Sequence, residues 1–378
     1  MATITRNDCE QNALSKQVKD FAVLVPGYID EIYARAVKVA ADMAAQDAAL
    51  VRPEAVYVTG CGDSYGASMA AAPALRALLP GCTVHPVRAS DLAGHVAAFR
   101  LKRGVLAMGI SVSGTTQRVL DGMARAKSCG AFTIGLTGGA DSPLGRDCDR
   151  TVALPQPEVS AEPGAPAPSV LSYAISCLGV IFTGVGLALA AGTITQEQAE
   201  GYREDAKAYC AACGERCQEQ ADDLFVLAQE LMGCDGFDFV GDDADFATAY
   251  FGSCKFAEGF GAFTVYDDSE NWEHVNHFIK DTRHMATFSV ISKSSPSLSR
   301  QLEQLPVVAY LGRKGVVVTD LPAERIEPQE LHVISLPEAP VSWLAPAANY
   351  LALSLLASYM TALSGEQFFR GFARPWNK

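Results

Sequence analysis

The chain has 378 residues and a formal net charge of −13, and 49% of its residues are hydrophobic. This length is enough for about two domains with a large buried core. The negative charge, which no basic run offsets, argues against nucleic acid and anionic membrane surfaces as partners. The first residues lack the charged-then-apolar pattern of an export signal, so we expect a cytoplasmic protein.

The first predicted strand, turn and helix follow an N-terminal segment, residues 1–45, that is expected to be helical. Val56–Gly60 has the pattern of a strand, and the glycine-bearing turn Cys61-Gly-Asp-Ser64 leads into a helix. Open parallel sheets bind ligands at the carboxyl ends of their strands, which is where Ser64 would lie. The alternative role of Ser64 is to cap the helix N-terminus.

The most informative segment is Gly109–Thr116, which reads Gly-Ile-Ser-Val-Ser-Gly-Thr-Thr. It lies between an apolar run at 104–108, expected to be a buried strand, and a predicted helix at 117–127. A strand that ends in a turn of Ser, Gly and Thr and opens a helix is typical of an anion site, because backbone N–H groups point at the anion. The alternative is an ordinary helix start, with Ser113 or Thr115 as the N-cap.

Two charge-free stretches, residues 163–195 and 339–365, are long enough to span a bilayer. Both have prolines near their start, and each follows a predicted strand and a proline-rich turn, about 175 residues apart. Helices that are apolar all round are typical of a protein core or a subunit interface. We therefore expect buried helices and no membrane insertion.

Other segments also recur in the same order in the two halves of the chain. The paired segments are Val56–Gly60 with Phe237–Gly241, Gly109–Thr116 with Val290–Ser297, and Phe132–Thr137 with Gly315–Asp320. Strands separated by helical segments indicate parallel sheets covered on both faces. The predicted organisation is a tandem duplication of an α/β domain, with a helical segment at 1–45, domains at 46–194 and 224–378, and a helical linker at 195–223.

Eleven cysteines are scattered along the chain, and without an export signal they are best interpreted as reduced thiols. Cys210, Cys213 and Cys217 share one face of a predicted helix and could begin a metal site, with Cys234 as a distant fourth ligand. No CxxC partner or nearby histidine completes a zinc pattern. We therefore favour a buried helix face.

The order of these parts resembles the SIS (sugar isomerase) domain family, and the whole chain resembles double-SIS proteins. The resemblance covers roughly residues 45–378 and is strongest in the Ser-x-Ser-Gly-x-Thr pattern at 111–116, followed by Gly-Cys-Gly-Asp-Ser at 60–64. The most similar members are the isomerase domain of glucosamine-6-phosphate synthase and the fructosamine-6-phosphate deglycases. The family fold implied is a flavodoxin-like three-layer sandwich in each half.

The resemblance also implies a set of residues that bind a sugar phosphate. Ser169, in the Pro-Ser turn before the first apolar helix, would close this site, although helix capping is its alternative role. Gly62 and Asp63 would lie beside it. The implied phosphate ligands are the side chains of Ser64, Ser111, Ser113 and Thr116 and the backbone N–H groups of Val112 and Gly114.

Chemistry is expected from the second half, where Lys255 and Glu258 lie three residues apart on a predicted helix. Moving a proton between C1 and C2 of an open-chain sugar needs one base that takes and returns it. In the resembling isomerase a helix has the same Lys-x-x-Glu spacing, with the glutamate as proton shuttle. Such a pair is otherwise most often a solvated surface pair.

His274 lies sixteen residues after Glu258, the spacing at which the resembling isomerase has its ring-opening histidine. Glu270, Glu273, His274 and His277 would share one side of a helix and could suggest a metal, but no other metallohydrolase feature accompanies them. We expect no metal and no cofactor.

The sequence departs from the family at Thr115, where relatives often have glutamate, and at Val275-Asn276, where they have Gly-Pro. The tail also differs, although Lys378 could still reach a site. We therefore expect a phosphosugar isomerase, or a deglycase that cleaves a sugar–amine adduct, acting as a homodimer or homotetramer with shared active sites. The alternative is a regulator that binds sugar phosphates without turnover.

Overall fold

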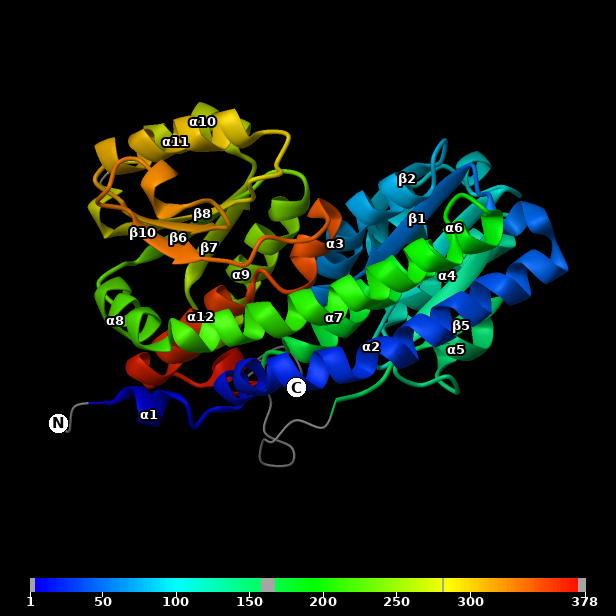
Figure 1. The fold of residues 1–378 in the computed structure, drawn as a ribbon, viewed down its shortest axis with the longest axis horizontal. Helices are drawn as coiled ribbons and strands as arrows, with labels where there is room; N and C mark the ends of the chain where they lie inside the picture. Colours follow the sequence, from blue (N-terminus) through cyan, green and yellow to red (C-terminus); the bar gives the residue numbers. More distant parts are fainter. Residues whose placement is uncertain (1–3, 158–166, 281, 373–378) are drawn as a thin grey trace. The chain divides into compact units, whose positions relative to one another are not determined.

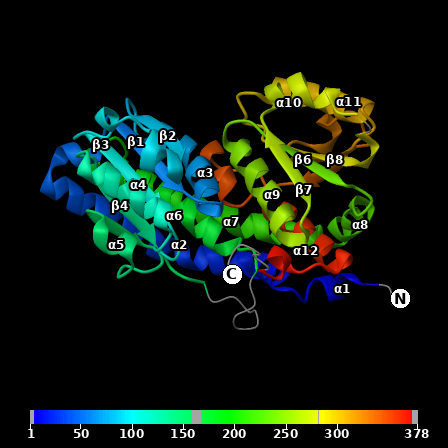
Figure 2. The same ribbon diagram turned by 180° about the vertical axis from the view of Figure 1, so that it is seen from behind.

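The computed structural model describes residues 4–157, 167–280 and 282–372, and the chain forms two compact units (Figures 1 and 2). One unit contains residues 24–157 and 172–208. The other contains residues 1–23, 158–171 and 209–378. Each unit is therefore assembled from segments that are distant in sequence. The predicted domain boundaries after residues 45, 194 and 223 stay a prediction.

The unit that contains residues 24–157 is built on a five-stranded parallel sheet with the order β2-β1-β3-β4-β5. The central strand β3 is buried at all six positions, which is typical of a parallel strand covered on both faces. The strands are β1 (Ala55–Gly60), β2 (Thr83–Arg88), β3 (Val105–Ile110), β4 (Phe132–Thr137) and β5 (Arg150–Ala153).

Helices cover both faces of this sheet. On one face, Leu136 and Leu154 contact α6, which also packs closely against α3 and α2. On the other face, Tyr57, Val105 and Ala107 pack with side chains of α4 and α5. The helices are α2 (Ala13–Gln46), α3 (Asp63–Leu78), α4 (Gln117–Ser128), α5 (Pro143–Asp147), α6 (Leu171–Ala191) and α7 (Gln196–Glu219), of which α2, α6 and α7 continue into the other unit.

The predicted helix after the Gly109–Thr116 segment is confirmed as α4, but the sequence pattern that places Leu120, Met123 and Ala124 on its buried face is wrong in part. Ala124 is exposed, and the buried positions are Val119, Gly122, Met123 and Ala126. The helix begins at Gln117 as predicted, but its buried face follows Val119, Met123 and Ala126, and Met123 packs under Gly109 of β3.

The second unit repeats the first. Its five parallel strands have the order β7-β6-β8-β9-β10, the same connectivity as β2-β1-β3-β4-β5. This identity of topology confirms the predicted duplication and fold class. The strands are β6 (Gly236–Val240), β7 (Phe263–Asp267), β8 (Met285–Ile291), β9 (Lys314–Thr319) and β10 (His332–Ser335).

The alternation of side chains along β6 assigns the helices of this unit to two layers. Phe237 and Phe239 contact Phe256 of α9, whereas Asp238 and Val240 contact Trp272 of α10 on the opposite face. In Figure 1, α10 and α11 lie above this sheet, and α9, α12 and α8 below it. These helices are α8 (Ala221–Leu231), α9 (Ala244–Phe260), α10 (Ser269–Val275), α11 (Leu298–Tyr310) and α12 (Leu351–Ser364).

Short helical segments complete the described chain. They are α1 (Arg6–Cys9), a π-helical segment at Asp91–His95, and 3₁₀ turns at Ala48–Val51, Ala98–Arg100, Asn276–Phe278, Thr282–His284, Ala323–Arg325, Ser342–Ala347 and Phe368–Phe372.

The two charge-free stretches form helices of different length. In the first, α6 is long and apolar enough to cross a membrane, but 89% of its most apolar window is buried, which is typical of a core helix. In the second, a 3₁₀ turn precedes α12, which has only 14 residues. The expectation of buried helices is therefore confirmed for both.

Candidate functional site

The strongest predicted binding segment forms a tight turn at the carboxyl end of β3. Gly114 has a φ of +65°, and a Cβ atom placed there would lie 1.9 Å from the Ser142 hydroxyl. Its N–H donates to the Ser111 carbonyl at 2.9 Å, and its own carbonyl accepts from the Leu144 N–H at 3.0 Å. Only glycine fits this position without strain, because the conformation is left-handed and the space is filled.

The turn presents backbone N–H groups that are open to a ligand. Within the residues that the structure describes, the N–H groups of Val112, Ser113, Thr116 and Gln117 have no hydrogen-bond acceptor. They lie at the N-terminus of α4, where the helix dipole favours negative charge. The Gly114 N–H, by contrast, is already used within the turn, so it is not a free donor for a ligand.

The alternative of a simple capped helix start is wrong. α4 begins at Gln117 with Thr116 as its N-cap, and neither Ser113 nor Thr115 has that position. The Thr116 side chain makes no capping hydrogen bond to the helix and instead lies 2.9 Å from the Ser111 hydroxyl. The hydroxyls of this turn therefore pair with one another, and Ser113 with Thr115 at 2.9 Å, while the helix amides stay open.

The predicted loop after β1 lies beside this turn, because β1 and β3 are paired neighbours in the sheet. Gly62 has a φ of +55° and precedes α3, which begins at Asp63. A Cβ atom on Gly60 would lie 2.5 Å from the Ser64 backbone, so the turn is too tight for a side chain there. Ser64 is half-buried in the first turn of α3 and is not the N-cap, which is Gly62.

Lys255 and Glu258 form a buried ion pair on α9. The Lys255 side chain is 0% exposed, and its Nζ lies 2.5 Å from Glu258 Oε2 and 4.6 Å from the centre of the Phe251 ring. The glutamate side chain remains 27% exposed. The interpretation as a solvated surface pair is therefore wrong. A carboxylate that reaches solvent while an ammonium is buried beside it can accept and return a proton near a fixed positive charge.

His274 lies on the opposite face of the second sheet from this pair. It is on α10, 70% exposed, and its Nε2 lies 2.9 Å from Glu270 Oε1. Glu270 in turn pairs with Arg300 at 2.7 Å. Because α9 and α10 occupy different layers, one chain does not bring Glu258 and His274 together on the second sheet.

The two remaining predicted residues are Ser169 and Lys378. Ser169 lies between Pro168 and Val170, whose carbonyls accept from Gln17 at 2.9 Å and Tyr350 at 3.0 Å, all within the unit that contains residues 209–378. The predicted phosphate-binding turn at 109–116, called the anion turn below, belongs to the unit that contains residues 24–157. Lys378 lies outside the described residues.

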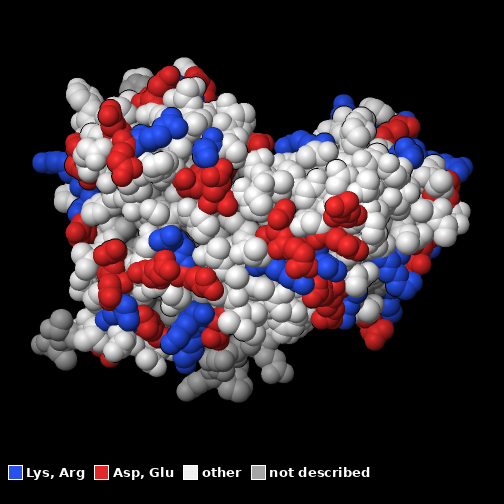
Figure 3. Space-filling view, viewed as in Figure 1, with Lys and Arg blue, Asp and Glu red and all other residues white. Residues whose placement is uncertain are grey.

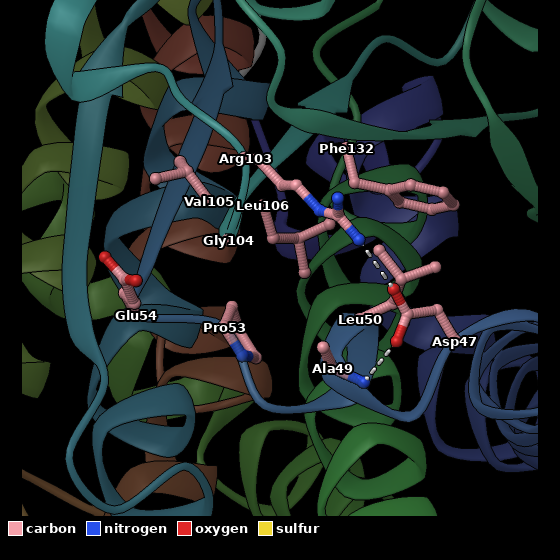
Figure 4. A pocket seen from close by; sticks show the side chains of 10 residues that line it. All are labelled: Asp47, Ala49, Leu50, Pro53, Glu54, Arg103, Gly104, Val105, Leu106 and Phe132. Carbon is pink, nitrogen blue, oxygen red and sulfur yellow. Dashed lines mark hydrogen bonds and ion pairs between the residues drawn. The ribbon is translucent and has the colours of Figure 1, made fainter.

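A separate cavity of about 310 Å³ lies at the opposite end of the first sheet (Figure 4). Its walls come from the segments that enter β1, β3 and β4, at the amino ends of these strands, where Arg103 contacts Asp47 at 3.4 Å. The anion turn follows the carboxyl end of β3. The cavity is therefore distinct from the predicted binding site, and it is lined by Asp47, Ala49, Leu50, Pro53, Glu54, Arg103, Gly104, Val105, Leu106 and Phe132.

The alternative metal sites gain no support from the described residues, in which no group of three or more His, Cys, Asp or Glu side chains is placed to hold an ion. All eleven cysteines are free thiols. Cys210, Cys213 and Cys217 are buried on α7, as the favoured interpretation expected, and burial raises the pKa of Cys213 to about 12. A thiol with so high a pKa stays protonated and behaves as a core residue.

Acidic and basic side chains are mixed on one face of the molecule. On the face drawn in Figure 3, lysine and arginine side chains are interspersed with aspartate and glutamate, and the described residues form no continuous basic surface there. A bound phosphate would therefore be held by the local donors of the turn.

Sequence reasoning missed two buried acidic residues. Asp245, 1% exposed at the start of α9, accepts hydrogen bonds from Ser292. Asp238 accepts from Trp272 at 2.5 Å and pairs with Arg313 at 2.6 Å in the layer of α10. For Asp238 the sequence did offer a signal, because a carboxylate inside the apolar strand Phe237-Asp-Phe-Val240 is unusual.

Comparison with known proteins finds a family match within the first half of the chain. Residues 49–181 match the SIS domain family. A curated relative, an uncharacterized HTH-type transcriptional regulator of Caldanaerobacter subterraneus subsp. tengcongensis, is 35% identical over 78 residues. That match spans 21% of this chain and 28% of the relative's length.

Solved structures share the fold of nearly the whole chain. The C-terminal domain of glucosamine-fructose-6-phosphate aminotransferase from Francisella tularensis has a TM-score of 0.79 and 18% identity, covering 94% of this chain and 97% of that one. Tagatose-6-phosphate ketose/aldose isomerase from Escherichia coli has a TM-score of 0.72 and 14% identity, covering 97% of both chains. At these identities the likeness shows the fold alone.

Proposed function

We propose that the chain binds a phosphorylated sugar or amino sugar and isomerises it between aldose and ketose, because residues 49–181 match the SIS domain family. The observation that carries the proposal is a set of backbone N–H groups that have no hydrogen-bond acceptor among the described residues, those of Val112, Ser113, Thr116 and Gln117. Four open N–H groups at a helix N-terminus suit a phosphate group. The Ser64 hydroxyl and one hydroxyl of the Ser111–Thr116 pair add donors beside them, since the other hydroxyl of the pair donates within it.

In the proposed reaction Glu258 is the single base. Its carboxylate takes the C2 proton of the open-chain aldose while O1 gains a proton, which gives an enediol. The carboxylic acid then returns the proton to C1 while O2 loses one, which gives the ketose. No oxidant or cofactor is needed, because the two carbons exchange oxidation states.

Lys255 and His274 have supporting roles in this proposal. The Lys255 ammonium lies 2.5 Å from Glu258 and stabilises negative charge that develops on the substrate oxygens. His274 is proposed to open the sugar ring. Cleavage of a fructosamine phosphate runs through an analogous enolamine with the same base, so a deglycase activity belongs to the same proposal.

The placement of α9 and α10 on opposite faces of the second sheet supports shared sites between chains. A small sugar does not bridge a sheet and two helix layers, since one helix alone is about 10 Å across. We therefore propose a homodimer or homotetramer in which a neighbouring chain supplies His274 to the site that uses Glu258. The site of action is proposed to be the cytoplasm.

The proposal is tested first by binding and then by proton exchange. A thermal-shift screen would compare hexose, hexosamine and fructosamine phosphates with the same sugars lacking phosphate. Hits should raise the melting temperature only when phosphorylated. They should also incorporate deuterium at C2 in D₂O, followed by NMR.

Glu258→Gln should lower turnover on the identified substrate by at least about 10²-fold, the scale of general acid–base catalysis, while the thermal shift is retained. Glu303→Gln is the matched control, because this glutamate is 65% exposed on α11. Turnover within a few-fold of the wild type in Glu258→Gln would refute the role of Glu258.

A sensor without turnover is the second candidate, and the curated relative favours it, since that protein is described as a transcriptional regulator. Phosphosugars that raise the melting temperature without any C2 exchange would select this function. The anion turn would then bind an effector, and Glu258 would be dispensable for binding.

A further inference from the structure

The two halves contain copies of the same strand–turn–helix. In the second copy, hydrogen-bond donors of the turn are bound by the chain's own carboxyl groups. Ser64 follows β1 after Gly60 and Gly62, and Asp245 follows β6 after Gly241 and Asp243. Gly62 and Asp243 share an unusual backbone conformation, with φ and ψ of 55° and −126° in one and 49° and −113° in the other. Asp245 is thus the second-half counterpart of Ser64.

Asp245 closes the turn that follows β8. This carboxyl group is 1% exposed and accepts the Ser292 N–H at 2.9 Å and the Ser292 hydroxyl at 2.6 Å. Ser292 directly follows β8, just as Ser111 directly follows β3, and β6 pairs with β8 as β1 pairs with β3. The hydroxyl and N–H donors of Ser292, at the start of this turn, are therefore hydrogen-bonded to the Asp245 carboxyl of the same chain.

The next amide of the second turn is satisfied in the same way. The Lys293 N–H donates to Asp320 Oδ1 at 2.6 Å, and the Lys293 ammonium lies 3.0 Å from both carboxylate oxygens of Glu338. In the first half the Val112 N–H has no acceptor among the described residues, and β4 is followed by Gly138 where β9 is followed by Asp320. The N–H group at the second position of the turn is therefore open in the first half and accepted by the Asp320 carboxyl in the second. At the first position the Ser111 N–H donates to the Leu136 carbonyl at 3.1 Å, whereas the Ser292 N–H donates to Asp245.

We propose that the turn after β8 is a second anion site for phosphate monoesters or inorganic phosphate that Asp245 keeps closed as an internal ligand. A carboxyl group offers two oxygen acceptors, which is why it can replace phosphate oxygens on the Ser292 donors. Its place at the first turn of α9 also ties this helix to β8. The comparison with Ser64 rests on the proposed phosphate-binding role of the first turn.

The test opens the second site and closes the first, with inorganic phosphate as the probe. Asp245→Ser removes the internal carboxyl and leaves the hydroxyl that Ser64 supplies in the first half. Phosphate binding to the wild type and the variant is counted by calorimetry at millimolar concentrations, with melting temperature as a second readout. The variant should bind one more phosphate per chain than the wild type, and phosphate should restore its lost thermal stability.

The matched control is Asp245→Asn, which fills the same space and should bind no additional phosphate. Ser64→Asp is the converse variant, expected to lose the first phosphate while its melting temperature is maintained. It keeps the proposal testable if Asp245→Ser does not fold. A marked fall in the melting temperature of Ser64→Asp would then count against a carboxyl as internal ligand.

Failure of the inference is distinguishable from failure of the proposed function. A folded Asp245→Ser that binds no more phosphate than the wild type overturns the internal-ligand proposal. A wild type that binds no phosphate overturns the proposed role of the first turn. The internal-ligand proposal is then still tested by whether Asp245→Ser binds one phosphate more than the wild type.

Discussion

Gly114 is the residue on which the geometry of the anion turn depends most directly. Its left-handed φ and its closeness to Ser142 mean that any side chain must displace the turn. Gly114→Ala should lower affinity for the identified phosphosugar at least tenfold and destabilise the protein by about 1–3 kcal/mol, the scale of backbone strain. Calorimetric titration and urea unfolding measure the two effects.

A glycine without such constraints provides the control. No heavy atom lies within 4 Å of a Cβ placed on Gly201, which is on α7 in the same unit. Gly201→Ala should leave binding unchanged and stabilise the helix by up to about 1 kcal/mol. Equal effects of the two substitutions on affinity would contradict a specific role for Gly114.

At the scale of elements, α10 is fixed to the second sheet by a buried polar network. Arg313, whose side chain is 0% exposed, pairs with Asp238 at 2.6 Å and stacks on the Trp272 ring with its guanidinium 5.2 Å from the ring centre. The same guanidinium donates to the Asn276 carbonyl at 3.0 Å, just beyond α10. This network holds the segment that carries His274.

Replacing one partner of the Asp238–Arg313 pair should strongly destabilise the folded protein, because the charge of the other partner is left buried. We expect Asp238→Leu and Arg313→Met each to destabilise the protein by roughly 3 kcal/mol, and the double variant by much less than their sum. Urea unfolding of all three variants gives the coupling free energy. Strictly additive losses would mean that the pair contributes only through packing.

The start of α9 should make stability depend on pH. Burial raises the pKa of Asp245 from an ordinary 3.8 to about 7, with Asp320 and Asp242 adding to the rise and hydrogen bonds from Ser292 opposing it. The folded protein therefore holds a proton on Asp245 between about pH 4 and pH 7 that the unfolded chain has released. Its stabilising effect is lost as pH rises through this window.

The measurement is the melting temperature of the wild type and Asp245→Asn between pH 5 and pH 8. The wild type should lose more stability across this range than the variant, which has no carboxyl to ionise there. Asp222→Asn, at a side chain that is 87% exposed, is the control and should follow the wild type. A variant whose pH profile matches the wild type would exclude Asp245 as the titrating group.

At the scale of the whole molecule, shared sites predict complementation between inactive chains. Glu258→Gln and His274→Asn should each be inactive alone. Mixed under conditions that exchange subunits, they should recover up to about a quarter of wild-type turnover, because half of the dimers are mixed and each has one intact site. Size-exclusion chromatography checks that assemblies form. No recovery in exchanged mixtures would show that one chain supplies both residues.

The sequence determined much of this architecture because its signals are local. Buried parallel strands such as β3 are continuous apolar runs, and glycine–hydroxyl turns such as 109–116 follow them directly. The recurrence of these segments was enough to predict two copies of one α/β fold, and topology confirms it. The Lys-x-x-Glu spacing likewise placed Lys255 and Glu258 on one helix.

Tertiary structure alone decided which of these groups are open and which are occupied. Burial of Lys255, the opposite layers of Glu258 and His274, and the capture of Ser292 by Asp245 all depend on contacts between residues distant in sequence. Local patterns report which donors a turn contains. Whether a carboxyl from another element already accepts them depends on packing, and this difference separates the open turn at 111–117 from its closed copy after β8.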